Sequence, residues 1–245
     1  MTTLLVHGAS GRLGSSIMRL AAETGPGTAV RAAGRDTPLE KAVTGCDVAV
    51  DVSQPAGTAR LVRAALAAGV PVVIGTTGHS QTELANIRDA SARLAILLAP
   101  NFSVGVNLLF WLADHAARTL GKEYRAEILE LHHELKKDAP SGTARRLGEI
   151  VAAARGLRYA DVARHGREGA ATARTAEELG MHAVRGGDII GEHTLFLIGP
   201  GERLELTHRA ASRELFARGA LRAATWLAGR PPGWYEMADA LNLPR

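Results

Sequence analysis

The sequence predicts an α/β protein in which a doubly wound parallel sheet is followed by an α+β domain with an open mixed sheet. Short apolar segments alternate with helical patterns as far as Pro100, which is typical of parallel strands joined by helices. A glycine-rich turn separates the first apolar segment from the first helix. Further along, two apolar segments flank the turn Gly199-Pro200-Gly201, which indicates an antiparallel hairpin.

The elements of the first part follow from hydrophobic spacing and turn residues. Residues 3–7 form an apolar strand that stops at Gly8, and apolar residues then recur at helical spacing up to the breaker at 25–27. Ser80 and Glu83 form a capping-box pattern, which predicts the start of a helix. The other expected elements are strands at 29–34, 48–52, 71–74 and 94–98 and a helix at 58–68.

The pattern changes after Pro100. The residues that follow predict helices at 104–120, 141–154 and 213–227, a strand at 125–131, and the hairpin strands 193–198 and 203–208.

Composition limits the function classes. The formal net charge is +4, without a basic run and with 4% aromatic residues, so nucleic-acid binding is not expected. Cys46 is the one cysteine, which excludes an internal disulfide. The N-terminal apolar segment is too short for a signal peptide, and no stretch approaches about eighteen apolar residues. We therefore expect a cytoplasmic protein that does not associate with membranes.

The glycine turn Gly8–Gly14 has the spacing G-x-x-G-x-x-G between a strand and a helix. Glycines there permit a tight turn and close backbone approach, and the helix N-terminus attracts phosphate, which favours a dinucleotide site over a purely structural turn. The sequence GTTG at 75–78 follows another strand of the same sheet, so it either lines the nicotinamide side of that site or forms an ordinary turn.

Residues 130–149, ELHHELKKDAPSGTARRLGE, gather titratable groups beside a helix start. Strand alternation directs His132 and His133 to opposite faces, so they are not expected to chelate one metal, and no metal site is predicted. Lys136 is notable because arginine outnumbers lysine 25 to 4, and lysine, unlike arginine, can donate a proton in the working pH range.

The helix start after this block is suited to an anion. Ser141 is expected at the N-cap, and Gly142 and Thr143 follow it, so the start can hold a carboxylate or phosphate. A solvated loop with a simple cap is the alternative. Beside a nucleotide site, the block indicates reduction of a small acidic substrate with proton delivery.

The motifs GASGRLG, GTTG, APNFSVGVN, ELHHELKKDAPSGTA and RGGDIIGEHTLFLIGPGERLELTHRA occur in this order along the chain. In these motifs the sequence resembles the 4-hydroxy-tetrahydrodipicolinate (dihydrodipicolinate) reductase family. The resemblance implies a Rossmann-type dinucleotide-binding domain, 1–103 completed by 214–245, and a substrate-binding and oligomerisation domain, 104–213. It also implies a small dicarboxylate substrate, a homotetramer, and a role in lysine and diaminopimelate biosynthesis.

The resemblance also implies roles for individual residues. His132 is the expected general acid/base and Lys136 the second proton donor and carboxylate anchor. The expected substrate contacts are His133, Ser141, Gly142 and Thr143. The expected cofactor contacts are Gly8, Ala9, Ser10, Gly11, Arg12, Leu13, Gly75, Thr76, Thr77, Ala99, Pro100, Asn101 and Phe102.

The end of the second strand bears on the choice of cofactor. Arg35 is placed to bind the 2′-phosphate of NADPH, whereas Asp36, if it turned inward, would favour NADH. We expect both cofactors to be used, with NADPH favoured. Two alternatives to the reductase are an NADPH-binding redox sensor or regulator, since this fold alone does not imply turnover, and a dehydrogenase of another small acid.

Overall fold

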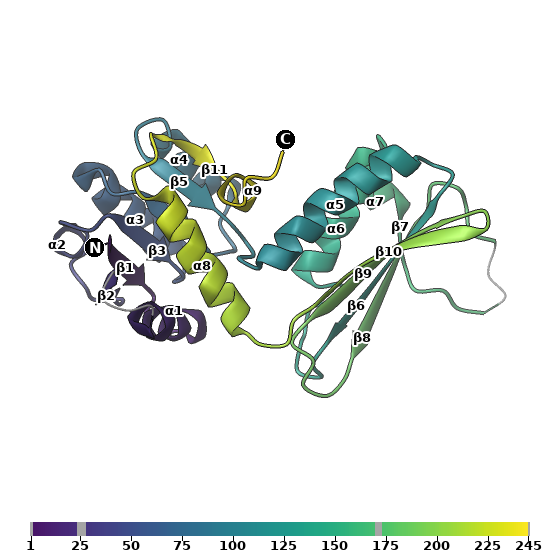
Figure 1. Ribbon diagram of the computed structural model, residues 1–245, viewed down its shortest axis with the longest axis horizontal. Coiled ribbons are helices and arrows are strands. Elements are labelled where there is room, and N and C mark those ends of the chain that lie inside the picture. The colour runs from purple at the N-terminus through teal and green to yellow at the C-terminus, as the bar shows by residue number, and fades with distance from the viewer. Residues whose placement is uncertain (1, 24–27, 170–172, 245) are drawn as a thin grey trace. The chain divides into compact units, whose positions relative to one another are not determined.

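The computed structural model describes residues 2–23, 28–169 and 173–244, so the breaker at 25–27 lies outside the described residues. The chain forms two compact units (Figure 1). Unit 1 comprises Met1–Val104 and Glu214–Arg245, and unit 2 comprises Gly105–Arg213.

Unit 1 is built on a six-stranded parallel sheet with the order β11-β5-β4-β3-β1-β2. The strands are β1 (Thr2–His7), β2 (Thr28–Ala33), β3 (Val48–Asp51), β4 (Val72–Ile74), β5 (Ala95–Leu98) and β11 (Gly233–Tyr235). The central strand β3 is buried along its whole length, as expected for a strand covered on both faces. This arrangement confirms the predicted doubly wound sheet.

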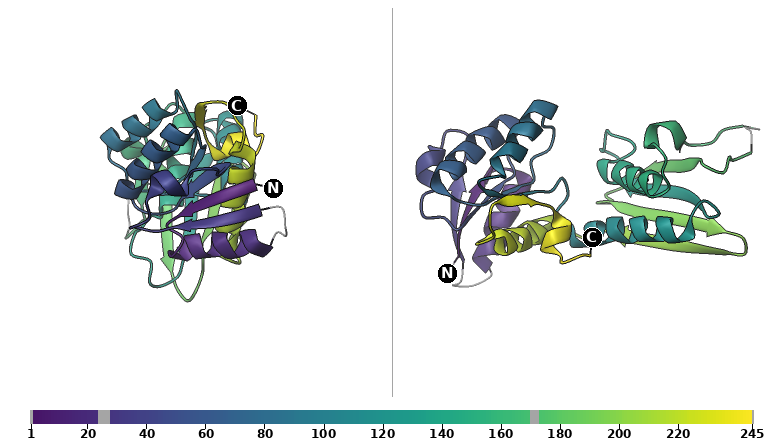
Figure 2. Two further views of the ribbon diagram at one scale, coloured as in Figure 1. Left: turned by 90° about the vertical axis from the view of Figure 1, so that its left-hand side faces the viewer. Right: turned by 90° about the horizontal axis from the view of Figure 1, so that it is seen from above.

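Helices cover both faces of that sheet (Figures 1 and 2). One face packs against α1 (Arg12–Glu23) and α8 (Glu214–Leu227), and α9 (Met237–Ala240) adds to the same core. The other face packs against α2 (Leu39–Ala42), α3 (Pro55–Ala68) and α4 (Gln81–Ala90). The predicted capping box at the start of α4 is present, since Ser80 Oγ accepts from Glu83 N and Glu83 accepts from Ser80 N.

Unit 2 contains a five-stranded mixed sheet with the order β10-β9-β6-β8-β7. The strands are β6 (Arg125–His132), β7 (Ala163–His165), β8 (Leu179–Arg185), β9 (Glu192–Gly199) and β10 (Glu202–Arg209). The hairpin β9–β10 pairs antiparallel with β6, whereas β8 runs parallel to β6 and β7. This confirms the predicted mixed sheet, although no strand had been predicted where β8 lies, in the glycine-containing segment between Gly166 and Gly191.

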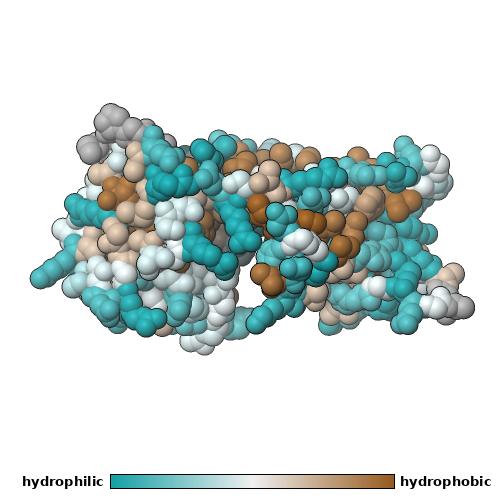
Figure 3. Space-filling view, turned by 90° about the horizontal axis from the view of Figure 1, so that it is seen from below, coloured by the Kyte–Doolittle hydropathy of each residue, from teal (hydrophilic) through white to brown (hydrophobic). Residues whose placement is uncertain are grey.

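One face of this second sheet is covered by α5 (Val104–Leu120) and α6 (Gly142–Ala154), and α7 (Tyr159–Val162) packs beside them (Figure 1). Strand β6 alternates strictly, so that Ile128, Glu130 and His132 are buried on the covered face. Val184 and Ile198, whose partners in β6 have odd numbers, lie on the opposite face and remain 44% and 40% exposed. The space-filling view shows one side of the molecule, on which apolar residues lie among hydrophilic ones (Figure 3).

Glu127 anchors an ionic cluster on the face of β6 opposite the helices. Its carboxylate accepts hydrogen bonds from Arg167, Arg174 and His182 at 2.7–3.1 Å. Burial would raise the pKa of Glu127, but these donors outweigh it and hold the pKa at about 2. The folded state therefore binds this proton less readily than the unfolded chain, and the cluster stabilises the fold only while Glu127 is ionised.

We expect Glu127→Gln to lower the free energy of unfolding by about 2–3 kcal/mol at neutral pH. The pKa of Glu127 falls from near 4.5 in the unfolded chain to about 2 in the folded state, and the stabilisation that this difference represents is lost with the carboxylate. The difference from wild type should shrink as the pH falls from about 4.5 toward 2. Denaturant unfolding at a series of pH values measures it. Glu149→Gln, which removes an exposed helical ion pair, is the control and should cost less than about 1 kcal/mol. A Glu127→Gln deficit that persists unchanged at low pH would contradict this account.

Candidate functional site

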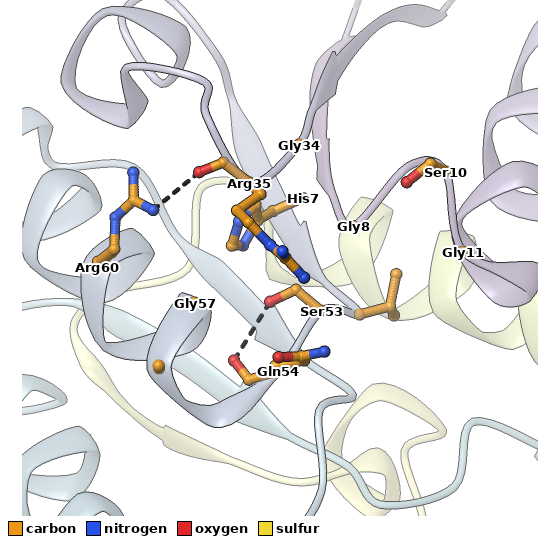
Figure 4. Close-up of a pocket in the computed structure, with 12 residues that line it drawn as sticks. His7, Gly8, Ser10, Gly11, Gly34, Arg35, Ser53, Gln54, Gly57 and Arg60 are labelled. Carbon is orange, nitrogen blue, oxygen red and sulfur yellow. Dashed lines mark hydrogen bonds between the residues drawn. The ribbon is translucent and has the colours of Figure 1, made fainter.

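The carboxyl edge of the sheet in unit 1 contains a cavity of about 430 Å³ (Figure 4). It lies where β1 and β3 end, and β1 is the strand from which the chain order runs outward in both directions. Open α/β sheets bind ligands at such switch points. The described residues that line the cavity are His7, Gly8, Ser10, Gly11, Gly34, Arg35, Val52, Ser53, Gln54, Ala56, Gly57 and Arg60.

The glycine turn joins β1 to α1 without room for side chains at two positions. Gly8 has a φ of +87°, and a Cβ there would lie 2.6 Å from the carbonyl oxygen of Val52. A Cβ on Gly14 would lie 2.1 Å from the carbonyl oxygen of Gly8. The first turn of α1 therefore packs directly on the loop, which brings a helix N-terminus to the side of the cavity and suits it to phosphate.

Two guanidinium groups line the same cavity. Figure 4 shows the Arg35 side chain extending into the pocket in the direction of Ser53. Arg60 on α3 donates a hydrogen bond of 2.9 Å to the carbonyl oxygen of Arg35. Asp36 is exposed and does not line the cavity. Among the described residues that line the cavity, none is Asp or Glu, so the charges on the lining itself are those of Arg35 and Arg60.

Other expected cofactor contacts lie outside the cavity: Ala9, Arg12, Leu13, Gly75, Thr76, Thr77, Ala99, Pro100, Asn101 and Phe102. Those from Gly75 onward follow β4 and β5 and lie at the same edge of the sheet. Gly75 packs on the buried Phe102, since a Cβ on Gly75 would lie 2.3 Å from that ring. Thr76 is buried and donates to Asp51 at 2.7 Å, whereas Thr77 is exposed. Gly75 and Thr76 therefore pack and bond within unit 1, whereas Thr77 is exposed to solvent.

A buried polar cluster supports the floor of this edge. Asp51, fully buried at the end of β3, accepts hydrogen bonds from four side chains: His7, Ser53, Thr58 and Thr76. Burial alone would raise the pKa of Asp51, but these four donors outweigh it and lower the pKa. The cluster fixes the loop after β3 against the end of β1, where the cavity lies.

In unit 2, His132 belongs to a buried network around Glu130. The Glu130 carboxylate accepts from His132 Nδ1, from both terminal nitrogens of Arg185 at 2.8 and 2.9 Å, and from the backbone N–H of Ser141 at 3.1 Å. Burial would raise the pKa of Glu130, but these hydrogen bonds hold it at about 2, so the carboxylate is ionised. A buried negative charge therefore lies directly behind the expected acid/base residue.

Ser141 caps α6 as expected. Its hydroxyl accepts from Ala144 N at 3.2 Å and pairs with His193 Nε2 at 3.1 Å, and its side chain is buried. His193 is buried and lies edge-on to His132, with ring centroids 5.2 Å apart. Burial, aided by the neighbouring His132, lowers the pKa of His193 to about 3, so this ring is neutral near pH 7.

The remaining expected substrate contacts lie at the surface around this network. Lys136 Nζ donates to Asp138 at 2.8 Å, which leaves two of its three N–H donors for other acceptors. His133 is half-buried, and its backbone N–H donates to Ile189 O at 2.7 Å. Gly142 is exposed and Thr143 half-buried at the N-terminus of α6, which opens to solvent.

Sequence reasoning missed several residues of both sites. Around the cavity it missed His7, Gly34, Val52, Ser53, Gln54, Ala56, Gly57 and Arg60. The position of Val52–Gln54 directly after a predicted strand was a usable signal, because carboxyl ends of parallel strands meet at one edge. In unit 2 it missed Glu130, Arg185 and His193. Glu130 could have been found from strand alternation, since it shares a face with His132, but nothing local marks Arg185 as its partner.

No helix in the described part of the chain is long and apolar enough to cross a membrane. Within the same residues, no group of three or more His, Cys, Asp and Glu side chains is arranged to hold a metal ion.

Comparison with known proteins covers the whole chain. Residues 2–102 match the family described as dihydrodipicolinate reductase, N-terminus, and residues 105–241 match its C-terminus. The 4-hydroxy-tetrahydrodipicolinate reductase of Akkermansia muciniphila is 49% identical over 244 residues, which cover 99% of each chain. That of Anaeromyxobacter dehalogenans strain 2CP-1 is 46% identical over 267 residues, covering 99% of this chain and 98% of the relative.

Among solved structures, dipicolinate-bound dihydrodipicolinate reductase from Paenisporosarcina sp. TG-14 has a TM-score of 0.79 at 23% identity, over 98% of each chain. A probable dehydrogenase from Thermotoga maritima has a TM-score of 0.59 at 10% identity, over 98% of this chain and 93% of the other. These two structures share the fold. Because both halves match one family and full-length relatives are nearly half identical, the chain belongs to the 4-hydroxy-tetrahydrodipicolinate reductase family.

Proposed function

We propose that the protein reduces 4-hydroxy-tetrahydrodipicolinate to tetrahydrodipicolinate, with the 4-hydroxyl group leaving as water, in a step of lysine and diaminopimelate biosynthesis, and that NADPH or NADH is held at the cavity of unit 1. The observation that supports the reductase activity is membership of the family over the full length of the chain. The residues around the cavity fit a dinucleotide, because a glycine loop without side chains, a helix N-terminus and two guanidinium groups all favour phosphate. When bound, the reduced nicotinamide supplies the hydride.

The proposed work of unit 2 is to hold two carboxylates and to supply a proton. Negative charge develops on the ring nitrogen of the substrate as hydride arrives, so a proton donor and fixed positive charge are needed there. We assign the proton to His132 and carboxylate binding, with secondary proton delivery, to Lys136. Gly142 and Thr143 at the helix start are suited to a second carboxylate, and His133 to orientation. Ser141 contributes by capping α6, since its hydroxyl already bonds to Ala144 N and His193 Nε2.

We propose a homotetramer as the assembled form. The face of the unit 2 sheet opposite α5 and α6 exposes Val184 and Ile198 beside the Glu127 ionic cluster, and burial of these apolar side chains against a second copy supports the assembly.

The activity is tested by following NAD(P)H oxidation with freshly made 4-hydroxy-tetrahydrodipicolinate. We expect oxidation only when that substrate is present. Reactions without substrate, and with other small unsaturated acids, are the controls. Cofactor binding without substrate-dependent turnover would instead indicate a redox sensor, and turnover of another acid alone would indicate a different dehydrogenase.

The proton donors are tested by substitution. His132→Gln and Lys136→Ala should each lower kcat by about 10²-fold or more, as expected for positioned proton donors. Cofactor affinity should change little, because the cavity belongs to unit 1. His133→Ala should act mainly on KM. His165→Gln, an exposed histidine on β7, is the control. Wild-type kcat in both the His132 and the Lys136 variants would exclude this mechanism.

Cofactor preference is tested at Arg35. We expect NADPH to be favoured by roughly ten- to a hundredfold in kcat/KM, which corresponds to about 1–3 kcal/mol of discrimination. Arg35→Ala should reduce that ratio, because the guanidinium lies in the cavity, whereas Asp36→Ala should leave it unchanged. Steady-state kinetics with both cofactors measures it. An unaltered ratio in Arg35→Ala would show that this residue does not bind the 2′-phosphate.

A further inference from the structure

We propose that Glu130, held in place by Arg185, is the positioning residue for His132: it fixes the imidazole with Nε2 free for the substrate and stabilises the protonated ring. This inference rests on the proposed role of His132 as the proton donor. Neither Glu130 nor Arg185 needs to touch the substrate for it.

The hydrogen bonds around Glu130 account for its full acceptor capacity in the plane of the carboxylate. Oε2 accepts from His132 Nδ1 and Arg185 Nη1, and Oε1 accepts from Arg185 Nη2 and Ser141 N. Glu130 is 0% exposed, so no water competes for these positions. The donors come from β6, the end of β8 and the start of α6, so the carboxylate is held from three sides.

This arrangement determines which nitrogen of His132 can act. Because an ionised carboxylate only accepts, Nδ1 carries the hydrogen, and Nε2 is the atom that exchanges its proton. Gly191 leaves space beside that atom, since a Cβ on residue 191 would lie 2.9 Å from Nε2. The side chain of His132 retains 10% exposure, whereas the Glu130 carboxylate behind it is fully buried.

Glu130 carries the negative charge that lies in contact with His132. Arg185 offsets the negative charge of Glu130, and protonation of His132 places a second cation on the same carboxylate. The other titratable or charged groups near this pair are His193 on β9, His208 on β10, and Lys136 and Asp138 in the loop after β6. Of these, His193 is neutral near pH 7 and Lys136 is paired with Asp138, so Glu130 is the anion in direct contact with His132.

The competing explanation is that Glu130 has a purely structural role. Glu127, on the same strand β6, is the matched control for it. Glu127 also accepts from two arginines and a histidine and has a similarly low pKa, but it lies on the opposite face of β6. Glu130→Gln and Glu127→Gln both replace a multiply bonded carboxylate by an amide of the same shape. Both should lose stability, whereas only the first should change the chemistry of His132.

The expected result for Glu130→Gln is a fall in kcat of about 10²-fold with much smaller changes in KM. The alkaline limb of its kcat–pH profile should move to lower pH, because the imidazolium has lost its neighbouring anion. Glu127→Gln should keep the wild-type profile, and gel filtration and melting temperature are measured for both variants. An unmoved limb in a folded Glu130→Gln, or an equal shift in Glu127→Gln, would overturn the proposal.

Glu130→Asp provides a test if the amide variant does not fold. It keeps the charge but withdraws it from the ring, so kcat should fall and the alkaline limb should move to lower pH. A folded Glu130→Asp with wild-type kcat and an unmoved limb would overturn the proposal.

A double-mutant cycle separates this inference from the proposed role of His132. In a His132→Gln background, Glu130→Gln should lower kcat no further, because its effect acts through the missing ring. Additive losses would overturn the positioning role while leaving His132 as the donor. Wild-type kcat in His132→Gln would instead remove the proposed function of His132 itself.

Discussion

The buried negative charge of Glu130 is the constraint on which the organisation of unit 2 depends. An isolated carboxylate in a protein interior would be neutralised or expelled, so its presence requires donors from every element around it. Arg185 reaches it from the end of β8, His132 from β6, and Ser141 from the start of α6. The same bonds that satisfy the charge therefore bring a histidine, a helix N-terminus and a strand end to one place.

Unit 1 is organised around the carboxyl edge of its parallel sheet. Parallel strands direct their carboxyl ends to one edge, and the ends of β1 and β3 lie side by side there. Gly8 and Gly14 remove the side chains that would fill the space, while Asp51 ties the following loop down through four hydrogen bonds. The result is an open cavity lined by Arg35 and Arg60 and supported by a rigid polar floor.

Much of this could be predicted from the sequence because the signals are local. Hydrophobic period, the cap at Ser141 and the glycine turn each depend on a few neighbouring residues, and the elements they predicted are present. The alternation of β6 holds as far as His132, which is buried on the same face as Glu130. The pairing of Arg185 with Glu130 could not be predicted from the sequence, because the two residues lie 55 positions apart. The strand that carries Arg185 also lies in a glycine-containing segment without a clear strand pattern. The short elements α2, α7, α9, β7 and β11 were also missed, because they lack the continuous apolar residues that predicted the equally short β3, β4 and β5.

The completion of unit 1 by residues 214–245 has a consequence for folding during synthesis. Its core on the α1 side includes Ala217, Ala220 and Leu227 of α8, and β11 pairs with β5 at the edge of the sheet. Since translation adds residues in order, β1 to β5 leave the ribosome with that face of the sheet covered by α1 but not by α8. Unit 2, whose residues are contiguous, can complete its own core first. Until residues 214–245 are made, the sheet of unit 1 therefore lacks its edge strand β11 and exposes the apolar surface that α8 covers.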